Sequence, residues 1–148
     1  MEAFSEARAA GRVADAYTSA KLAKDSAPRA PSVREAIGLA AYDDGRWHES
    51  AQELLAHRRL AGAHANDAMI ADCFRRLGEP HRALEFLAPL GIADVGTAIW
   101  CAAQIVRGDA LADLGRTDTA LAILESARRK APPRARPVID AALARLRA

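Results

Sequence analysis

Several features that mark other protein classes are scarce in this chain of 148 residues. Aromatic residues make up only 5% of it, and the two cysteines, Cys73 and Cys101, are far apart in the sequence. Such cysteine usage indicates a reduced, cytoplasmic protein and argues against a disulfide scaffold. No apolar run approaches the roughly 18 residues of a membrane span, and the N-terminus lacks the apolar core of a signal peptide. We therefore expect a single cytoplasmic domain over residues 1–148 that does not associate with membranes.

β-Branched residues are also few, which argues against a β-sheet. Val and Ile together supply 12 residues, whereas Ala supplies 37 and Leu 15. Because Ala and Leu favour helices and β-branched residues favour strands, the composition predicts an all-α protein. Arg outnumbers Lys by 18 to 3, which, with the alanine content, indicates a GC-rich bacterial genome.

Positive charge is concentrated at the C-terminal end. Residues 128–148 contain seven basic residues and one acidic residue, whereas the rest contains 14 basic and 18 acidic residues. The seven basic residues are Arg128, Arg129, Lys130, Arg134, Arg136, Arg145 and Arg147. We call the first five of them the basic patch. Such a patch fits an exposed helix end, where cations match the helix dipole. The alternative is a nucleic-acid or ribosome-associated protein that contacts phosphates here, although no interleaved aromatic residue is present for base stacking.

Four glycines recur at nearly constant spacing, and other residues recur with them. The glycines are Gly11, Gly45, Gly78 and Gly115, separated by 34, 33 and 37 residues. We call them the repeat glycines. Five residues after each lies a small residue, namely Ala16, Ser50, Ala83 and Ala120. Seven residues before the last three lie Gly38, Ala71 and Gly108, and nine residues after them lie Leu54, Leu87 and Leu124. These coincidences indicate an internal repeat.

The sequence around Gly45 predicts two helices joined by a tight turn, an αα-hairpin. Apolar residues recur at helical spacing before it, at Val33, Ala36, Ile37, Ala40 and Ala41. Ser32 and Glu35 have the spacing of a capping box at the start of the first helix. Gly45 supplies the left-handed residue that ends this helix, and Gly62 closes the second one. Gly38 and Ser50 are small enough to let the helices approach closely, with Trp47 filling the space beside the turn.

The same reasoning predicts helices at residues 2–10, 12–25, 32–44, 47–60, 65–77, 80–88, 96–114, 117–130 and 137–147. The stretch "PLGIADVG" lengthens the connection before the last hairpin and explains the spacing of 37. In the final helix, Val138, Ala141, Ala142 and Leu146 are expected on one side, as in a helix that caps a repeat array.

This pattern resembles the tetratricopeptide repeat, whose unit is about 34 residues long. The three full repeats match it at Gly38, Gly45, Trp47 and Leu54, at Ala71, Gly78, Ala83 and Leu87, and at Gly108, Gly115, Ala120, Leu124 and Ala127. A partial repeat matches at Gly11, Ala16 and Pro28, whereas Ser50, Pro80 and Thr117 depart from the pattern. The resemblance implies a right-handed αα-hairpin solenoid. It would comprise a partial repeat at 1–28, repeats at 31–62, 64–90 and 96–130, and a cap helix at 134–147.

The resemblance also implies a concave groove lined by the first helix of each hairpin. Carried over by position, its residues are Glu35, Leu39, Tyr42, Asp43, Ala68, Asp72, Arg75, Arg76, Ile105, Asp109 and Asp113. Family members that clamp a carboxylate use Lys and Asn where this chain has Glu35 and Leu39, or Ala68 and Asp72. The groove would instead suit a protein segment with basic residues and an apolar anchor. The implied function is a non-enzymatic adaptor, with a homodimer through the partial N-terminal repeat as a further expectation.

Catalytic and metal-binding patterns are weak by comparison. His48 has no second histidine four residues away, as a helical metal site would require, so we expect His48 and Glu49 to face water. His64 and His81 are isolated in the same way. Buried, inert thiols are expected for the two cysteines, and "GRTDTAL" lacks the second glycine and the lysine of a phosphate-binding loop. We therefore predict no catalytic residue, no metal and no cofactor.

Overall fold

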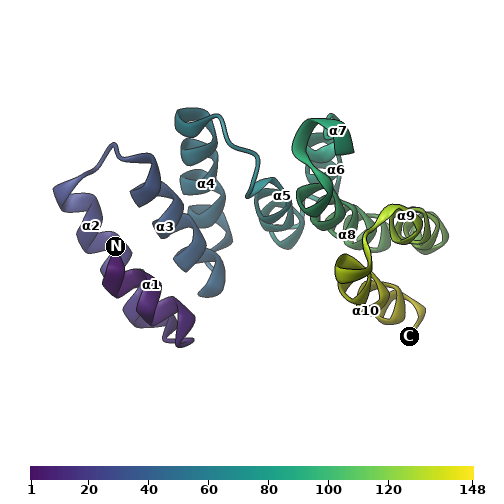
Figure 1. Cartoon of the computed structure of the whole chain (residues 1–148), viewed down its shortest axis with the longest axis horizontal. Coiled ribbons are helices and arrows are strands. Elements are labelled where there is room, and N and C mark those ends of the chain that lie inside the picture. Colours follow the sequence, from purple (N-terminus) through teal and green to yellow (C-terminus); the bar gives the residue numbers. More distant parts are fainter. The chain divides into compact units, whose positions relative to one another are not determined.

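The computed structural model describes all 148 residues. The chain is all-helical, with 80% of its residues in helices and no strand, as the composition predicts. The helices are α1 (Glu2–Ala9), α2 (Val13–Ser26), α3 (Pro31–Asp43), α4 (Trp47–Ala61), α5 (Asp67–Arg76), α6 (Pro80–Leu87), α7 (Ile92–Val95), α8 (Thr97–Asp113), α9 (Thr117–Lys130) and α10 (Arg136–Arg147), with a short 3-10 turn at Pro133–Ala135 before α10. Figure 1 shows them in chain order.

The four repeat glycines form the same turn each time. All have a positive φ, between 69° and 82°, which costs glycine little because it has no Cβ. At Gly45 the amide donates to the Tyr42 carbonyl at 3.0 Å, and the next amide donates to the Ala41 carbonyl at 2.8 Å. Equivalent pairs of bonds occur at the other three glycines. This is the Schellman arrangement that satisfies the last carbonyls of a helix, and the next helix begins two residues after each glycine.

The repeated small and apolar residues pack between the helices of a hairpin. The residues five and nine positions after the four glycines are all buried, with at most 1% of their surface exposed. A Cβ added to Gly38 would lie 2.6 Å from Leu54 Cγ, and one added to Gly108 would lie 3.1 Å from Leu124 Cγ. Ser50 donates from its buried hydroxyl to the Gly38 carbonyl at 2.8 Å. The close helix approach predicted from the small residues is therefore confirmed.

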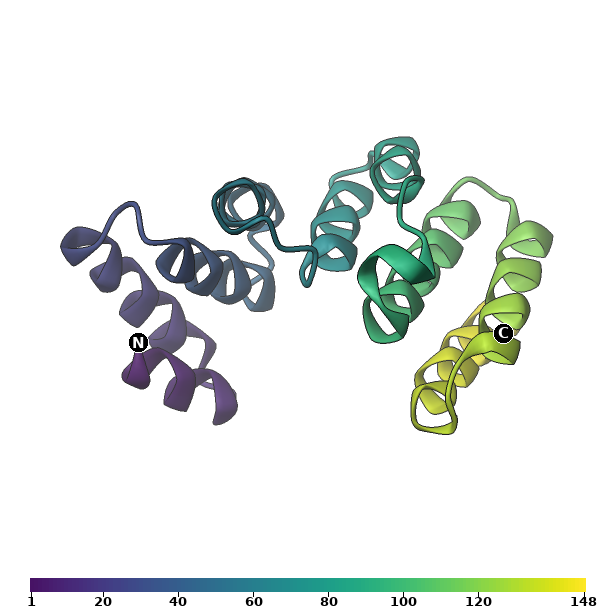
Figure 2. The same ribbon diagram turned by 45° about the horizontal axis from the view of Figure 1, so that its top comes forward.

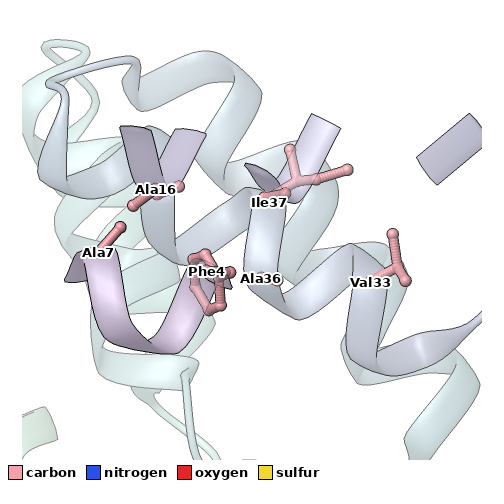
Figure 3. Close-up of a cluster of buried hydrophobic side chains, with 8 residues drawn as sticks. Phe4, Ala7, Ala16, Val33, Ala36 and Ile37 are labelled. Carbon is pink, nitrogen blue, oxygen red and sulfur yellow. The ribbon is translucent and has the colours of Figure 1, made fainter. Parts of the chain in front are cut away.

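The chain divides into two compact units, Met1–Cys73 and Phe74–Ala148, and the division falls within α5. In the first unit, α1 packs on α2, α2 on α3 and α3 on α4, as the views in Figure 1 and Figure 2 agree. Its core joins Phe4 of α1 to Ala16 of α2 and to Val33 and Ile37 of α3, as Figure 3 shows. Alanines fill the remaining contacts, which keeps the helices close.

In the second unit, α8 packs on α6 and α9, and α10 covers both α8 and α9. Its core gathers Cys101 of α8, Leu124 of α9 and, from α10, Ile139 and Leu143. The segment expected to be a plain lengthening contains the one-turn helix α7, which packs on α8. Cys73 and Cys101 are both buried and form no disulfide, and burial raises the pKa of Cys101.

Two local predictions are wrong. The helix α3 begins at Pro31 with Ala30 as its N-cap and has no side-chain cap, so Ser32 and Glu35 do not form a capping box. Proline at the first helical position has a suitable φ and needs no hydrogen-bond acceptor for its nitrogen. Because the helix begins at Pro31, Ser32 lies inside the first turn and its hydroxyl is not at the N-cap position.

The buried face of α10 also differs from the prediction. Ile139, Ala142 and Leu143 are buried, whereas Val138 is 59% exposed and Ala141 is exposed as well. Both sets have helical spacing, but turning Ile139 and Leu143 inward removes more apolar surface from water. Burial of the larger side chains therefore decides the rotation of the helix.

Candidate functional site

The predicted groove residues of the first unit lie on α3 and α5, and hydrogen bonds connect these helices. Tyr42 of α3 donates its hydroxyl hydrogen to Asp72 of α5 at 2.5 Å. Asp72 is only 4% exposed. Asn66, in the connection before α5, donates to the Glu35 carboxylate of α3 at 2.8 Å. The structure therefore brings Glu35, Tyr42 and Asp72 onto adjoining elements. Leu39 and Ala68, on the same two helices, are half-buried.

The helix α1 joins this surface through an ion pair that the sequence interpretation missed. Arg8 of α1 donates from Nε to Asp43 of α3 at 2.7 Å, with a second contact from Nη2 at 3.4 Å. Arg8 lies three residues before Gly11, which is the position of Tyr42 relative to Gly45. Extending the groove positions to the partial N-terminal repeat would have identified it. We call the adjoining faces of α1, α3 and α5 within residues 1–73 the first-helix surface.

A hollow of about 630 Å³ opens between α1, the start of α2 and the end of α3, beside the Arg8–Asp43 pair. Its walls are mostly apolar, and it is lined by Phe4, Ser5, Arg8, Ala9, Gly11, Val13, Ala16 and Asp43. Phe4 and Ala16 belong to the buried core beneath it. Pockets of this volume accommodate small ligands or the side chains of a bound segment, so this hollow is a candidate recess for an apolar anchor.

The second unit repeats the ion pair between first helices. Arg75, three residues before Gly78, donates to Asp113, two residues before Gly115, at 3.0 Å. This matches Arg8 and Asp43 in the first unit, so the same bond recurs in the repeat. Another predicted groove residue, Asp109, accepts from Arg145 of the last helix at 2.7 Å. Ile105 packs against the core, and Arg76 is exposed.

These contacts change the electrostatic expectation for the predicted groove. The carboxylates of Asp43, Asp72, Asp109 and Asp113 all accept hydrogen bonds from side chains of the same chain. Three of those four donors are arginines, which neutralise the negative charge locally. A basic ligand would compete with these arginines, so the acidic residues favour it less than the sequence alone indicates.

The basic patch is partly neutralised in the same manner. Arg128 forms an ion pair with Asp140, and their hydrogen bond raises the pKa of Arg128. Arg136 donates to the Ala131 carbonyl, and Lys130 lies 5.6 Å from the ring centre of Trp100. Arg129 and Arg134 are exposed and form no ion pair. Within the patch only Arg128 has its charge compensated by a carboxylate. Arg145 and Arg147, outside the patch, are also ion-paired, so three of the seven basic residues at the C-terminal end are compensated within the chain.

The histidine and glutamate predictions have mixed outcomes. His48 is exposed, as expected, and Trp47 stacks edge-on against Tyr42 beside the turn, with ring centres 5.3 Å apart. Glu49, however, does not simply face water, because its carboxylate accepts from Tyr17 at 2.8 Å and from Lys21 at 2.7 Å. Desolvation raises the pKa of Glu49, but these hydrogen bonds and the nearby cationic charges outweigh it and lower the pKa overall.

His64 has no partner histidine in the sequence, but it does contact a carboxylate. Its Nδ1 lies 2.8 Å from the carboxylate of Asp67, which is 1% exposed and also accepts from Arg58 at 2.8 Å. Because a buried carboxylate needs hydrogen-bond donors, His64 and Arg58 together hold the start of α5. Only the spacing His64-x-x-Asp67 could have indicated this contact in the sequence.

Comparison with known proteins adds no family or relative to this description. No protein-family model matches the chain, and no curated protein matches its sequence. Every helix is too short or too polar to cross a lipid bilayer.

Proposed function

We propose that this chain is a tetratricopeptide-type αα-hairpin repeat protein of the bacterial cytoplasm that binds a segment of another protein. It acts as an adaptor and catalyses no reaction. The fold part of the proposal is supported by the four identical glycine turns, their spacing of 34, 33 and 37 residues, and the burial of the small residues that follow each turn. A solenoid stacks such hairpins so that each covers the apolar face of its neighbour.

The binding part of the proposal is carried by one observation, the mostly apolar hollow beside the Arg8–Asp43 pair. The hollow opens between residues of α1, α2 and α3, and hydrogen bonds hold the surrounding helices in position. A helix surface with fixed neighbours can receive a protein segment without paying a large ordering cost. The neighbouring carboxylates are already paired within the chain. The main contribution to binding would therefore come from a large apolar side chain of the ligand, inserted among Phe4, Ala9 and Val13.

A photo-crosslinking experiment tests this proposal. A crosslinking amino acid placed at Ser5 lies in the lining of the hollow, and one placed at Gln52 lies on an exposed position of α4 outside it. We expect one or a few protein adducts in cells from position 5 and none of the same size from position 52. Equal adducts from both positions, or none from position 5, would refute binding at the hollow.

A variant in the purified system then separates the site from the fold. Ala9 is exposed and lines the hollow, so Ala9→Arg fills the recess with a charged chain without disturbing the core. The control is Ala14→Arg on α2, which is exposed and outside the hollow. We expect Ala9→Arg to weaken binding of the crosslinked partner at least tenfold, with the control unchanged.

A further inference from the structure

The last helix, α10, has the sequence pattern of α3. Both helices have a proline near their start, Pro31 in α3 and Pro137 in α10. Counted from that proline, the third, sixth and seventh residues of each helix are apolar and buried. They are Val33, Ala36 and Ile37 in α3, and Ile139, Ala142 and Leu143 in α10. The helix α10 therefore has the features of the first helix of a hairpin.

The two helices differ in what covers their next face. The eighth residue of α3, Gly38, is buried, and Leu54 of the following helix, α4, lies directly over it. The eighth residue of α10, Ala144, is exposed, while α10 itself packs on α8 and α9. Where α3 is covered by α4, α10 thus presents an open face.

A groove of about 510 Å³ lies along this open face, between α9 and α10. From α10 it is lined by Asp140, Leu143, Ala144 and Arg147, at the positions of Arg34, Ile37, Gly38 and Ala41 in α3. From α9 it is lined by Glu125 and Arg128, which follow Gly115 as Lys21 and Lys24 of α2 follow Gly11. The groove between α9 and α10 therefore corresponds to the space between α2 and α3.

In the first unit that space is occupied by α4, whose carboxylates bind the cations on both sides. Glu53 accepts from Lys24 of α2 at 3.1 Å and from Arg34 of α3 at 2.9 Å. Glu49 accepts from Lys21 of α2 at 2.7 Å. The residues that line the groove in the second unit are thus the counterparts of residues that hold a helix in the first.

We propose that the groove between α9 and α10 binds an amphipathic helix of another protein, in the place that α4 occupies on α2 and α3. An apolar helix face that enters a groove is a common mode of recognition between proteins. The ligand helix places a leucine over Ala144, as α4 places Leu54 over Gly38. A separate helix can lie slightly farther out, which leaves room for the extra methyl group of Ala144.

The charges of the groove determine which residues flank that leucine. Glu53 directly precedes Leu54 and binds Lys24, and the counterpart of Lys24 is Arg128, so the ligand carries a carboxylate directly before its leucine. Glu49 lies five residues before Leu54 and binds Lys21, but the counterpart of Lys21 is the acidic residue Glu125. The ligand therefore carries Lys or Arg at that earlier position.

The ion pairs already in the groove do not prevent this binding. Arg128 pairs with Asp140 and Arg147 with Glu125, and all four side chains are about half exposed. Such pairs contribute little to stability, so ligand charges can join them at small cost. Arg129 also lines the groove and has no ion pair within the chain, which leaves the groove with a net positive charge for a ligand carboxylate.

The test uses a fluorescein-labelled peptide with the sequence of residues 46–61 and the purified full chain, with binding followed by fluorescence anisotropy. The peptide carries Glu49→Lys, and it carries Arg58→Gln and Arg59→Gln to remove two charges that the basic C-terminal end would repel. A second peptide differs only in keeping Glu49. We expect saturable binding of one Lys peptide per chain, and binding of the Glu peptide several-fold more weakly because Glu125 repels it.

Variants of the full chain then locate the bound peptide. Ala144→Arg fills the centre of the groove from an exposed position and should weaken binding of the Lys peptide about tenfold. Its matched control is Ala141→Arg, because Ala141 is an exposed alanine of the same helix that does not line the groove. We expect the control to bind as wild type does, with unchanged circular dichroism in both variants.

Four outcomes would overturn the proposal. Wild type that shows no saturable binding would mean that the groove accepts no helix of this pattern. Equal binding by Ala144→Arg and Ala141→Arg would place the peptide elsewhere. Tighter binding of the Glu peptide would indicate general attraction to positive charge, and displacement of the peptide by a short duplex RNA would assign the groove to phosphates. The groove lies in Phe74–Ala148 and the hollow in Met1–Cys73, so this proposal and the proposed function can fail separately.

Discussion

The buried carboxylate of Glu53 gives the sharpest test of how the first unit is held together. Glu53 of α4 has only 10% of its side chain exposed and accepts from Arg34 of α3 at 2.9 and 3.1 Å and from Lys24 of α2 at 3.1 Å. One residue therefore links three helices. The Nε of Arg34 is buried and has no hydrogen-bond partner. The charge of the Arg34 guanidinium is therefore compensated by the Glu53 carboxylate, which its Nη1 contacts. We predict that Glu53→Gln strongly destabilises this unit.

The expected magnitude follows from the burial of the three groups. Removing one partner of a fully buried ion pair costs about 3–5 kcal/mol, because the remaining charge is left without compensation. The cations here are 27% and 33% exposed, so water relieves part of that cost. We expect Glu53→Gln to lower the free energy of unfolding by about 2–3 kcal/mol.

Urea denaturation followed by tryptophan fluorescence measures this loss of unfolding free energy in the first unit. Trp47 lies in the first unit and Trp100 in the second, so Trp47 fluorescence in a Trp100→Phe background reports the first unit. The control is Asp15→Asn, which breaks an exposed ion pair with Arg12 in the same unit and should cost at most about 1 kcal/mol. A Glu53→Gln variant as stable as this control would refute the reasoning.

Two further predictions concern helix spacing and pH. Gly38→Ala should lower the free energy of unfolding, measured by thermal denaturation, by about 1–3 kcal/mol, because the added Cβ would lie 2.6 Å from Leu54. Gly108→Ala should cost less, because its nearest neighbour, Leu124, is 3.1 Å away; equal losses in the two variants would contradict this. Burial raises the pKa of Glu49, but its bond to Lys21 contributes to a net shift below the usual 4.5. Its ionised form thus stabilises the fold above pH 4.5, and the advantage of wild type over Glu49→Gln in urea titrations should shrink as pH falls below that value.

Helices and turns were predictable because their signals are local. The signal for each turn is a glycine that adopts positive φ, followed by a helix with a small buried residue. Both parts of this signal lie within a few positions of the sequence, as at Gly45 and Ser50. The prediction of α3 from Val33, Ala36 and Ile37 was within one residue of the observed bounds for the same reason. Helical periodicity depends only on which side chains share a face.

The polar contacts were not predictable because their partners are distant in the sequence. Arg8 meets Asp43 across 35 residues and Tyr42 meets Asp72 across 30. Long side chains reach whatever the packed helices place nearby, so their partners depend on tertiary structure. Glu49 shows the same limit: its position on α4 was predicted, but its bond to Tyr17 required the placement of α2.

The glycine turns also determine where this chain can change length. Each turn passes from one helix to the next in a fixed number of residues, so an insertion there would break the bonds that close the helix. Spacing varies only between hairpins, and the longest spacing contains the four-residue helix Ile92–Val95. A peptide tag or reporter domain is thus best inserted between Gly91 and Gly96, where added residues extend a connection and leave the hairpins intact.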